Sequence, residues 1–137
     1  FWVSLLEKMK DKSDLFANIT PQRSIWISKG AGRFGLSFQF VIHRHDAQVL
    51  FAINRAKEES KIIFDKLLAS KQVIEQKFEG ELDWQRKDNL KSSLIINNIP
   101  IGGYHDDDKW EKIQDAMIDA MIRLNGALRQ HIDELNI

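Results

Sequence analysis

The chain has 137 residues, 43% of them hydrophobic and 29% charged, which is the size and composition of one globular domain with a core of its own. Its 20 basic residues balance 20 acidic ones, so the formal net charge is zero and the usual electrostatic signature of a strongly basic nucleic-acid binder is missing. Because the chain has no cysteine, disulfides and thiolate chemistry are excluded.

Neither a membrane span nor a signal peptide is expected. No run of about 18 apolar residues is present, and the first residues lack the basic segment that opens a signal peptide. We therefore expect a cytoplasmic protein that does not enter a membrane. Because the chain begins with Phe rather than Met, we expect residues 1–137 to be a single domain cut from a longer protein.

The first part of the chain is predicted to be a helix followed by three strands. Residues 1–16 place apolar side chains on one helical face, and Pro21 disfavours helix at the residue before it. Three short runs rich in β-branched and aromatic residues follow at 24–28, 36–42 and 49–53. Glycine and polar turns separate these runs, which indicates a three-stranded meander. Alternation in the second run predicts one buried face and one partly wet face.

The second part begins with a long amphipathic helix over residues 56–78. Apolar residues form one stripe of this helix, and Lys61 is assigned to the solvated side. Gly80 predicts the end of the helix. A hairpin is expected next, with strands at 82–86 and 93–97 joined by a polar turn.

The last helix runs to about residue 134 and is predicted to start at Asp108, which forms a capping box with Glu111 three residues later. Its apolar residues occupy a wide arc, which fits either a central helix or a docking face. The predicted order is α-β-β-β-α-β-β-α. Strands in local runs favour an α+β fold with a mainly antiparallel sheet of about five strands and helices packed on it.

A resemblance to a family rests on short segments spread over nearly the whole chain. These segments are Phe1-Trp2, Ile19-Thr20-Pro21, Trp26-Ile27, Phe40-Val41-Ile42, Ile53-Asn54-Arg55, Ile63-Phe64-Asp65-Lys66-Leu67, Leu82-Asp83-Trp84 and Met117 to Leu124. Together they resemble a bacterial and archaeal family of domains of unknown function. Its members are commonly the C-terminal domains of proteins whose N-terminal part resembles PD-(D/E)XK endonucleases. The resemblance implies a cytoplasmic accessory domain with a nuclease-like neighbour, and it supplies no catalytic residues.

Cations and aromatic residues in or beside the predicted strands form a candidate nucleic-acid-binding set. The set is Lys29, Arg33, Arg44, Arg55, Lys87, Lys91, Trp26 and Trp84, joined by Arg86 and Phe34. Aromatic rings stack on bases and cations contact phosphates, so this set would suit single-stranded or bent DNA or RNA. In the alternative interpretation the aromatic residues belong to the core and the cations are scattered, which the zero net charge favours.

Metal chemistry has only weak candidates. His43, His45 and Asp46 lie in a predicted turn and could ligate a metal, although such residues are more often simply exposed. The acids at 106–108 complement the start of the last helix. A nuclease core needs Glu-x-Lys on a strand, whereas residues 59–61 lie in a predicted helix. We therefore assign no catalytic residue, no metal and no cofactor.

These observations favour a non-catalytic accessory domain of a nuclease-like bacterial protein, which binds nucleic acid or supports the catalytic module. The alternative is a protein-interaction or dimerisation domain that docks a second copy, and the third interpretation is a divalent-metal-dependent nuclease. A contiguous basic face would favour nucleic acid, and an exposed apolar patch would favour a protein partner.

Overall fold

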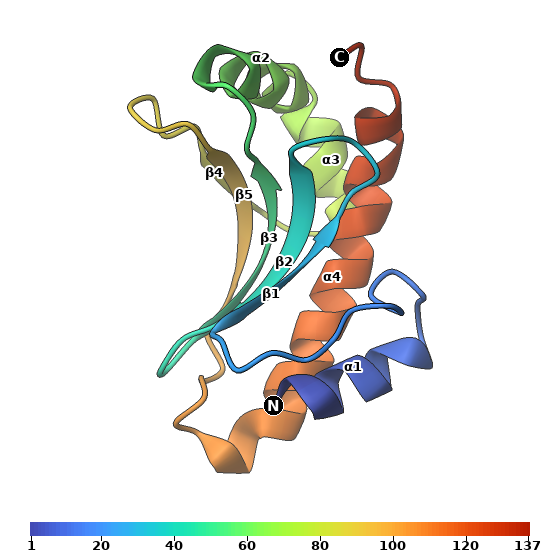
Figure 1. The fold of residues 1–137 in the computed structure, drawn as a ribbon, viewed down its shortest axis with the longest axis vertical. Helices are drawn as coiled ribbons and strands as arrows, with labels where there is room; N and C mark the ends of the chain where they lie inside the picture. Colours follow the sequence, from blue (N-terminus) through green and yellow to red (C-terminus); the bar gives the residue numbers. More distant parts are fainter.

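A five-stranded antiparallel sheet organises the fold, with its strands in the spatial order β1-β2-β3-β5-β4 (Figure 1). The computed structural model describes every residue from 1 to 137. The strands are Trp26–Gly30 (β1), Leu36–Ile42 (β2), Ala47–Ile53 (β3), Asp83–Gln85 (β4) and Ser93–Ile99 (β5). Every neighbouring pair is antiparallel, so the predicted meander and second hairpin are confirmed.

Four α-helices lie against one face of this sheet (Figure 1). They are Trp2–Lys10 (α1), Lys57–Leu68 (α2), Lys71–Phe78 (α3) and Trp110–Asp133 (α4), and a 3-10 helix at Asp107–Lys109 (η1) precedes the last. Buried residues of all four α-helices and of one side of the sheet form a single hydrophobic core. The predicted α+β class is confirmed, and the observed order contains one more helix than expected.

The central helix of the domain is α4. It contacts α1, α3 and the strands β2, β3 and β5. Met117 and Met121 of its main apolar stripe are buried, and so are Ile118 and Ile132 of its second stripe. The wide apolar arc is therefore filled within the domain, because the sheet and two other helices cover different sides of the same helix.

The predicted helix over residues 56–78 is two helices, because its two halves pack on different surfaces. α2 contacts β3 and β5, whereas α3 contacts α4. One straight helix cannot reach both surfaces, so the chain turns at Ser70. α3 ends at Phe78, and Glu79 takes the left-handed conformation (φ 66°) just before the predicted stop at Gly80.

The first helix ends at Lys10, earlier than predicted. The hydroxyl of Ser13 accepts a hydrogen bond from the backbone N–H of Leu15 at 3.2 Å, a local bond that competes with helix continuation. Phe16 is nevertheless buried in the core. The apolar spacing therefore identified a core residue correctly while the helical assignment of its segment was wrong.

The capping box predicted for the last helix is wrong. Asp108 lies inside η1, α4 begins at Trp110, and no side chain caps either helix. Asp106 accepts the backbone N–H of Gly103 at 2.8 Å. An acid in this run therefore closes the loop before the helix instead of capping it.

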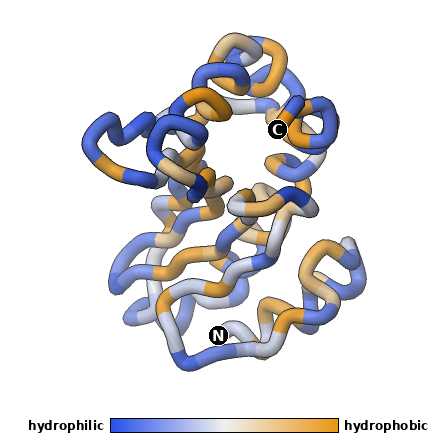
Figure 2. Tube along the Cα trace, turned by 45° about the horizontal axis from the view of Figure 1, so that its top comes forward, coloured by the Kyte–Doolittle hydropathy of each residue, from blue (hydrophilic) through white to orange (hydrophobic).

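Side chains along each strand alternate between two faces of the sheet. In β2, Leu36, Phe38 and Phe40 are buried in the main core, and Ser37 and Gln39 between them are only half-buried. Figure 2 shows this alternation as orange segments interrupted by blue and white ones along the strands. One face therefore belongs to the core, and the opposite face is the surface on which a site is sought.

Candidate functional site

The face of the sheet that points away from the helices is the candidate site, and we call it the open face. Its residues are Trp26, Ser28 and Gly30 of β1, Ser37, Gln39 and Val41 of β2, Gln48, Leu50 and Ala52 of β3, Asp83 and Gln85 of β4, and Leu94, Ile96 and Asn98 of β5. The small apolar cluster at its centre contains strand residues only. No helix therefore covers this face, in agreement with Figure 1.

The open face is polar but almost uncharged. Asp83 is its only charged residue, in a chain of which 29% is charged. Amide and hydroxyl groups surround the apolar centre and bond to one another: Gln48 Nε2 donates to Asn98 Oδ1 at 2.8 Å, and Gln39 Nε2 donates to Ser37 Oγ at 3.3 Å. Such groups both donate and accept hydrogen bonds, so the face can bond to neutral polar partners.

Trp26 is the one aromatic residue on the open face. It lies opposite Val41 at the start of the edge strand β1, and 48% of its surface is exposed. The Ser24 hydroxyl accepts the backbone N–H of Trp26 at 3.3 Å and also donates to its backbone carbonyl. Both bonds fix the backbone of Trp26, so its ring is presented from a defined position.

Three of the predicted cations lie at the two ends of the strands that make this face. Arg44 is in the exposed turn between β2 and β3, and Lys87 and Lys91 are in the turn between β4 and β5. Because the strands are antiparallel, these two turns lie at opposite ends of the sheet. In Figure 1 both turns lie on the side away from α4. The open face is thus bracketed by cations although it contains none.

Two other predicted cations lie elsewhere. Arg33 donates to the backbone carbonyl of Ile132, in the last turn of α4, at 2.9 Å and to that of Leu135, just beyond the helix, at 2.8 Å. The carbonyls at a helix end lack the usual intrahelical donors, and that of Ile132 accepts the N–H of Leu135 at 3.2 Å besides its bond from Arg33. Lys29 alternates with the open-face residues of β1 and lies opposite Phe38, on the helix side. Arg33 therefore completes the end of a helix, and Lys29 is not part of the open face.

Arg55 and Trp84 are also engaged inside the domain. Arg55 Nε donates to the carbonyl of Phe34 at 2.7 Å, and its guanidinium lies over the ring of this exposed residue at 5.5 Å from the centroid. Trp84 is half-buried and donates its indole N–H to Glu75 Oε2 at 3.1 Å. The backbone N–H of Leu82 also donates to Glu75 and is the largest cause that lowers the pKa of this carboxyl.

The histidine turn does not assemble a metal site. His43 Nδ1 lies 2.9 Å from Asp46 Oδ1, and His45 Nδ1 lies 3.6 Å from Asp106 Oδ2. The two histidines thus pair with different carboxylates. No group of three or more histidine, aspartate or glutamate residues is arranged to hold a metal ion. The hydrogen bond from Gly103 is the largest cause that lowers the pKa of Asp106.

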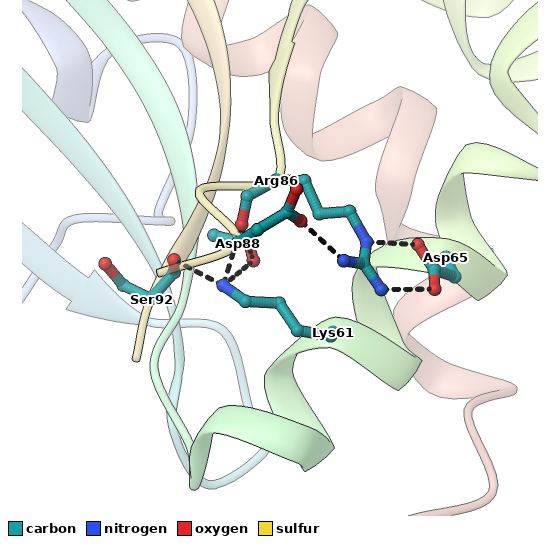
Figure 3. Close-up of polar contacts among 6 residues, drawn as sticks. Lys61, Asp65, Arg86, Asp88 and Ser92 are labelled. Carbon is teal, nitrogen blue, oxygen red and sulfur yellow. Dashed lines mark hydrogen bonds and ion pairs between the residues drawn. The ribbon is translucent and has the colours of Figure 1, made fainter. Parts of the chain in front are cut away.

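A buried lysine is the feature that sequence reasoning missed. Lys61 was assigned to the solvated side of a helix, but only 7% of its surface is exposed. Its Nζ donates to the carbonyls of Arg86 at 2.7 Å and Ser92 at 2.9 Å and to Ser93 Oγ at 2.9 Å (Figure 3). Burial is the largest cause that lowers the pKa of Lys61. All three ammonium protons have protein partners, so Lys61 holds the β4–β5 hairpin to α2 and is not a free ligand group.

A second link joins the same hairpin to α2. The guanidinium of Arg86 donates to both carboxylate oxygens of Asp65, at 2.9 and 3.0 Å, and to Asp88 at 2.5 Å (Figure 3). The hydrogen bond from Arg86 is the largest cause that lowers the pKa of Asp65. Lys61 and Arg86 together fix the turn that contains Lys87 and Lys91. The only sequence signal was that Lys61 borders the apolar stripe of α2.

The fold and the open face define a small α+β domain whose sheet is covered by helices on one face only. Residues 1–132 match the family described as Domain of unknown function (DUF4268), and the chain belongs to this family. The resemblance to a family of unknown function is thereby confirmed. No curated protein and no solved structure matches the chain. None of the helices combines the length and apolar character that a membrane crossing requires.

Proposed function

We propose that this domain is a non-catalytic accessory domain that binds single-stranded nucleic acid on the open face. The observation that carries the proposal is the exposed ring of Trp26 on an uncovered face of neutral hydrogen-bonding groups. Cations at both ends of the strands, Arg44 at one and Lys87 and Lys91 at the other, would contact the phosphates.

The chemistry of the face suits bases better than a duplex backbone. A base stacks on an aromatic ring with about 1–3 kcal/mol, and amides such as Gln39 and Asn98 bond to base edges as donors and acceptors. A seven-residue strand such as β2 is about 23 Å long, enough to accommodate several nucleotides. Duplex binding relies on many phosphate contacts, which a chain of zero net charge is poorly equipped to make.

The accessory role follows from the resemblance to C-terminal domains of endonuclease-like proteins. In this proposal the open face holds the strand, and a nuclease-like module of the same bacterial, cytoplasmic protein acts on it. DNA and RNA are both candidate ligands, because neutral amides and a stacking ring do not select the sugar.

A protein-interaction or dimerisation face is the second candidate function. The apolar centre formed by Val41, Leu50, Ala52 and Ile96 favours it, together with the scarcity of charge around that centre. Depletion of charged residues is typical of the core of protein interfaces. A second copy of the chain would need no charge complementarity to dock there.

Anisotropy titrations with labelled single- and double-stranded DNA and RNA, at low and physiological salt, test the proposal. We expect micromolar or tighter binding of single strands. The logarithm of the affinity should fall against that of the salt concentration with a slope of about −2, since each of three phosphate contacts contributes about −0.7. Trp26→Ala should weaken binding about tenfold or more. Phe34→Ala is the matched control, because it removes an aromatic ring that is 82% exposed but lies outside the open face.

Absence of binding at low salt would overturn the nucleic-acid proposal. Analytical ultracentrifugation would then test the second candidate function. A concentration-dependent dimer that is lost when Leu94 is replaced by Glu would support a docking face for a second copy. Leu94 is suited to this test because it is only half-buried and packs against the buried apolar centre of the open face.

A further inference from the structure

A groove of about 630 Å³ lies on the opposite side of the start of β1, between α1, the segment before β1 and the start of α4. Its volume falls in the range of about 300–1,000 Å³ that is typical of small-molecule sites. It is lined by Phe1, Trp2, Val3, Arg23, Ile25 and Tyr104, together with Pro21, Gln22, Ser24, Ile42 and Trp110.

The aromatic walls of this groove are held in place. Trp2 donates its indole N–H to the carbonyl of Ser24 at 2.7 Å, and Trp110 donates to the carbonyl of Tyr104 at 3.3 Å. The ring of Phe1 packs edge-on against both indoles, with centroid distances of 5.1 and 5.4 Å. The walls therefore keep their positions without a ligand, which lowers the entropy cost of binding one.

The position of Tyr104 is fixed from the other side. Its backbone N–H donates to the carbonyl of His43 at 2.9 Å. Gly103 comes so close to this turn that an added Cβ would lie 2.0 Å from the same carbonyl oxygen. The close approach keeps Tyr104 against the β2–β3 turn, which also contains Arg44.

Apolar surface that the fold leaves exposed gathers at this groove. Val3 is 57% exposed, Ile25 48% and Tyr104 40%, and all three are lining residues. Exposed apolar side chains are unremarkable when scattered, but a cluster in a concavity marks a binding site. The apolar walls favour a ligand with a planar or apolar group.

The polar groups of the groove favour the binding of an anion. Arg23 has the only charged side chain of the lining, and this side chain is exposed and makes no ion pair or hydrogen bond. No acidic residue lines the groove. The amide of Gln22 and the hydroxyl of Tyr104 also have no partner in the domain. The free donors therefore include a guanidinium, whose geometry matches phosphate.

We infer that this groove binds one nucleotide of a single strand, with the base against the aromatic walls and the phosphate on Arg23. The inference rests on the proposed function and extends it. Ile25 of the groove directly precedes Trp26, the first residue of β1. The carbonyl of Ile25 accepts the backbone N–H of Ile42 at 2.7 Å, so the alternation of β1 extends to it and places the two side chains on opposite sides of the sheet. A strand that leaves the open face across β1 therefore enters the groove directly.

The test compares groove variants in the titrations with single strands. With Arg23 as a fourth phosphate contact beside Arg44, Lys87 and Lys91, the wild-type salt slope should be about −2.8 instead of about −2. Arg23→Gln should weaken binding about threefold and return the slope to about −2, because it removes one contact. Tyr104→Ala should weaken binding about fivefold or more through lost stacking, and Tyr104→Phe should restore it. Lys77→Gln is the matched control, because it removes one exposed charge outside both the groove and the open face. An oligonucleotide with 5-iodouracil should photo-cross-link to Tyr104 or Trp110.

The outcomes separate this inference from the proposed function. One outcome would overturn the groove inference and leave the open face as the binding site. In that outcome the wild-type chain binds single strands, the groove variants bind them equally well, and cross-links form only at Trp26. If no strand binds, the proposed function fails, and NMR with free AMP and UMP decides the groove. Shifts of the Trp2 and Trp110 indole signals that are absent in Arg23→Gln would then support a site for free nucleotides. Unchanged indole signals would overturn it.

Discussion

The two faces of the sheet are built by the same strands, but only one of them has its chemistry dictated by folding. On the helix side, Phe38, Phe40 and Phe51 are completely buried and contribute to the main core. On the open face, Leu50 belongs to a small apolar cluster that no helix covers, and Gln39 lies opposite Leu50 on the neighbouring strand. Burial explains the first face fully. Burial also explains the apolar centre of the second face, whose four residues are 4–9% exposed, but it does not explain why the more exposed residues around that centre carry almost no charge. This scarcity of charge at exposed positions is the reason for proposing a binding role for the open face.

The largest expected effect is a difference in the free energy of unfolding between a core variant and an open-face variant. Phe51→Ala removes a fully buried ring from the core and should lower the free energy of unfolding by about 3–5 kcal/mol. Leu50→Ala, one residue earlier and on the open face, should cost about 2 kcal/mol, because Leu50 is 4% exposed but its cluster contains only four buried residues and no helix. Urea denaturation measures both. Equal losses would mean that the open face is a second core and not an available surface.

The next effect concerns the hairpin that brackets the open face. Lys61→Met keeps the length of the side chain but leaves the carbonyl of Ser92 without its side-chain donor, whereas the carbonyl of Arg86 keeps the hydroxyl of Ser93 at 2.7 Å, so we expect a loss of about 1–3 kcal/mol. Lys66→Met on the exposed side of α2 is the matched control and should change stability by less than about 0.5 kcal/mol. Hydrogen exchange of the Leu90 amide, which donates to the carbonyl of Lys87 at 2.9 Å in this turn, should rise in the first variant only. Unchanged protection there would show that Lys61 does not fix the turn.

A smaller effect depends on pH. The pKa of Glu75 is lowered in the folded state, mainly by the N–H of Leu82. Ionised Glu75 therefore adds to the free energy of unfolding at a pH above its unfolded pKa, and this stabilisation is lost as the pH falls through its folded pKa. Glu75→Gln keeps one acceptor for Leu82 and Trp84 and should cost about 1 kcal/mol at pH 7. Thermal unfolding from pH 7 to pH 3 should show a smaller acid loss in the variant than in the wild type. Parallel curves would contradict this role.

The smallest effect on stability should accompany a clear effect on binding. Gln39 lies half-buried in the middle of the open face, and Gln39→Glu should change the free energy of unfolding by less than about 0.5 kcal/mol. The added negative charge should nevertheless weaken binding of single strands about tenfold, whereas Gln39→Lys should strengthen it. The two variants differ only in the sign of the charge. Equal affinities in anisotropy titrations would exclude nucleic acid from this face.

Local patterns predicted most of the elements. Alternation in residues 36–42 identified β2 and its buried face correctly, and the apolar stripes located α2, α3 and α4. The errors arose where a local signal competed with packing. The capping pattern at Asp108 did not set the start of α4, and residues 56–78 divided into two helices because each half follows a different surface.

The candidate site was only partly predictable. Trp26, Arg44, Lys87 and Lys91 were named from the sequence, and they lie on or at the ends of the open face. Composition and spacing could not show that Arg33 instead completes the end of α4, because its partners lie about a hundred residues away in the chain. The groove beside β1 was not predicted, since its walls come from separated segments.

The sequence by itself determined the strands, the helices, the side of each strand that enters the core and the absence of net charge, since these depend on local periodicity and composition. Only the tertiary structure decided which polar residues became internal ties and which stayed free. The sequence assigned Lys61 to the solvated side of a helix and Arg33 to the nucleic-acid-binding set, and each side chain instead bonds to backbone carbonyls of a distant segment. Such roles depend on which segments meet in space. A buried backbone carbonyl without a hydrogen-bond donor costs free energy, and in this fold nearby cationic side chains supply such donors.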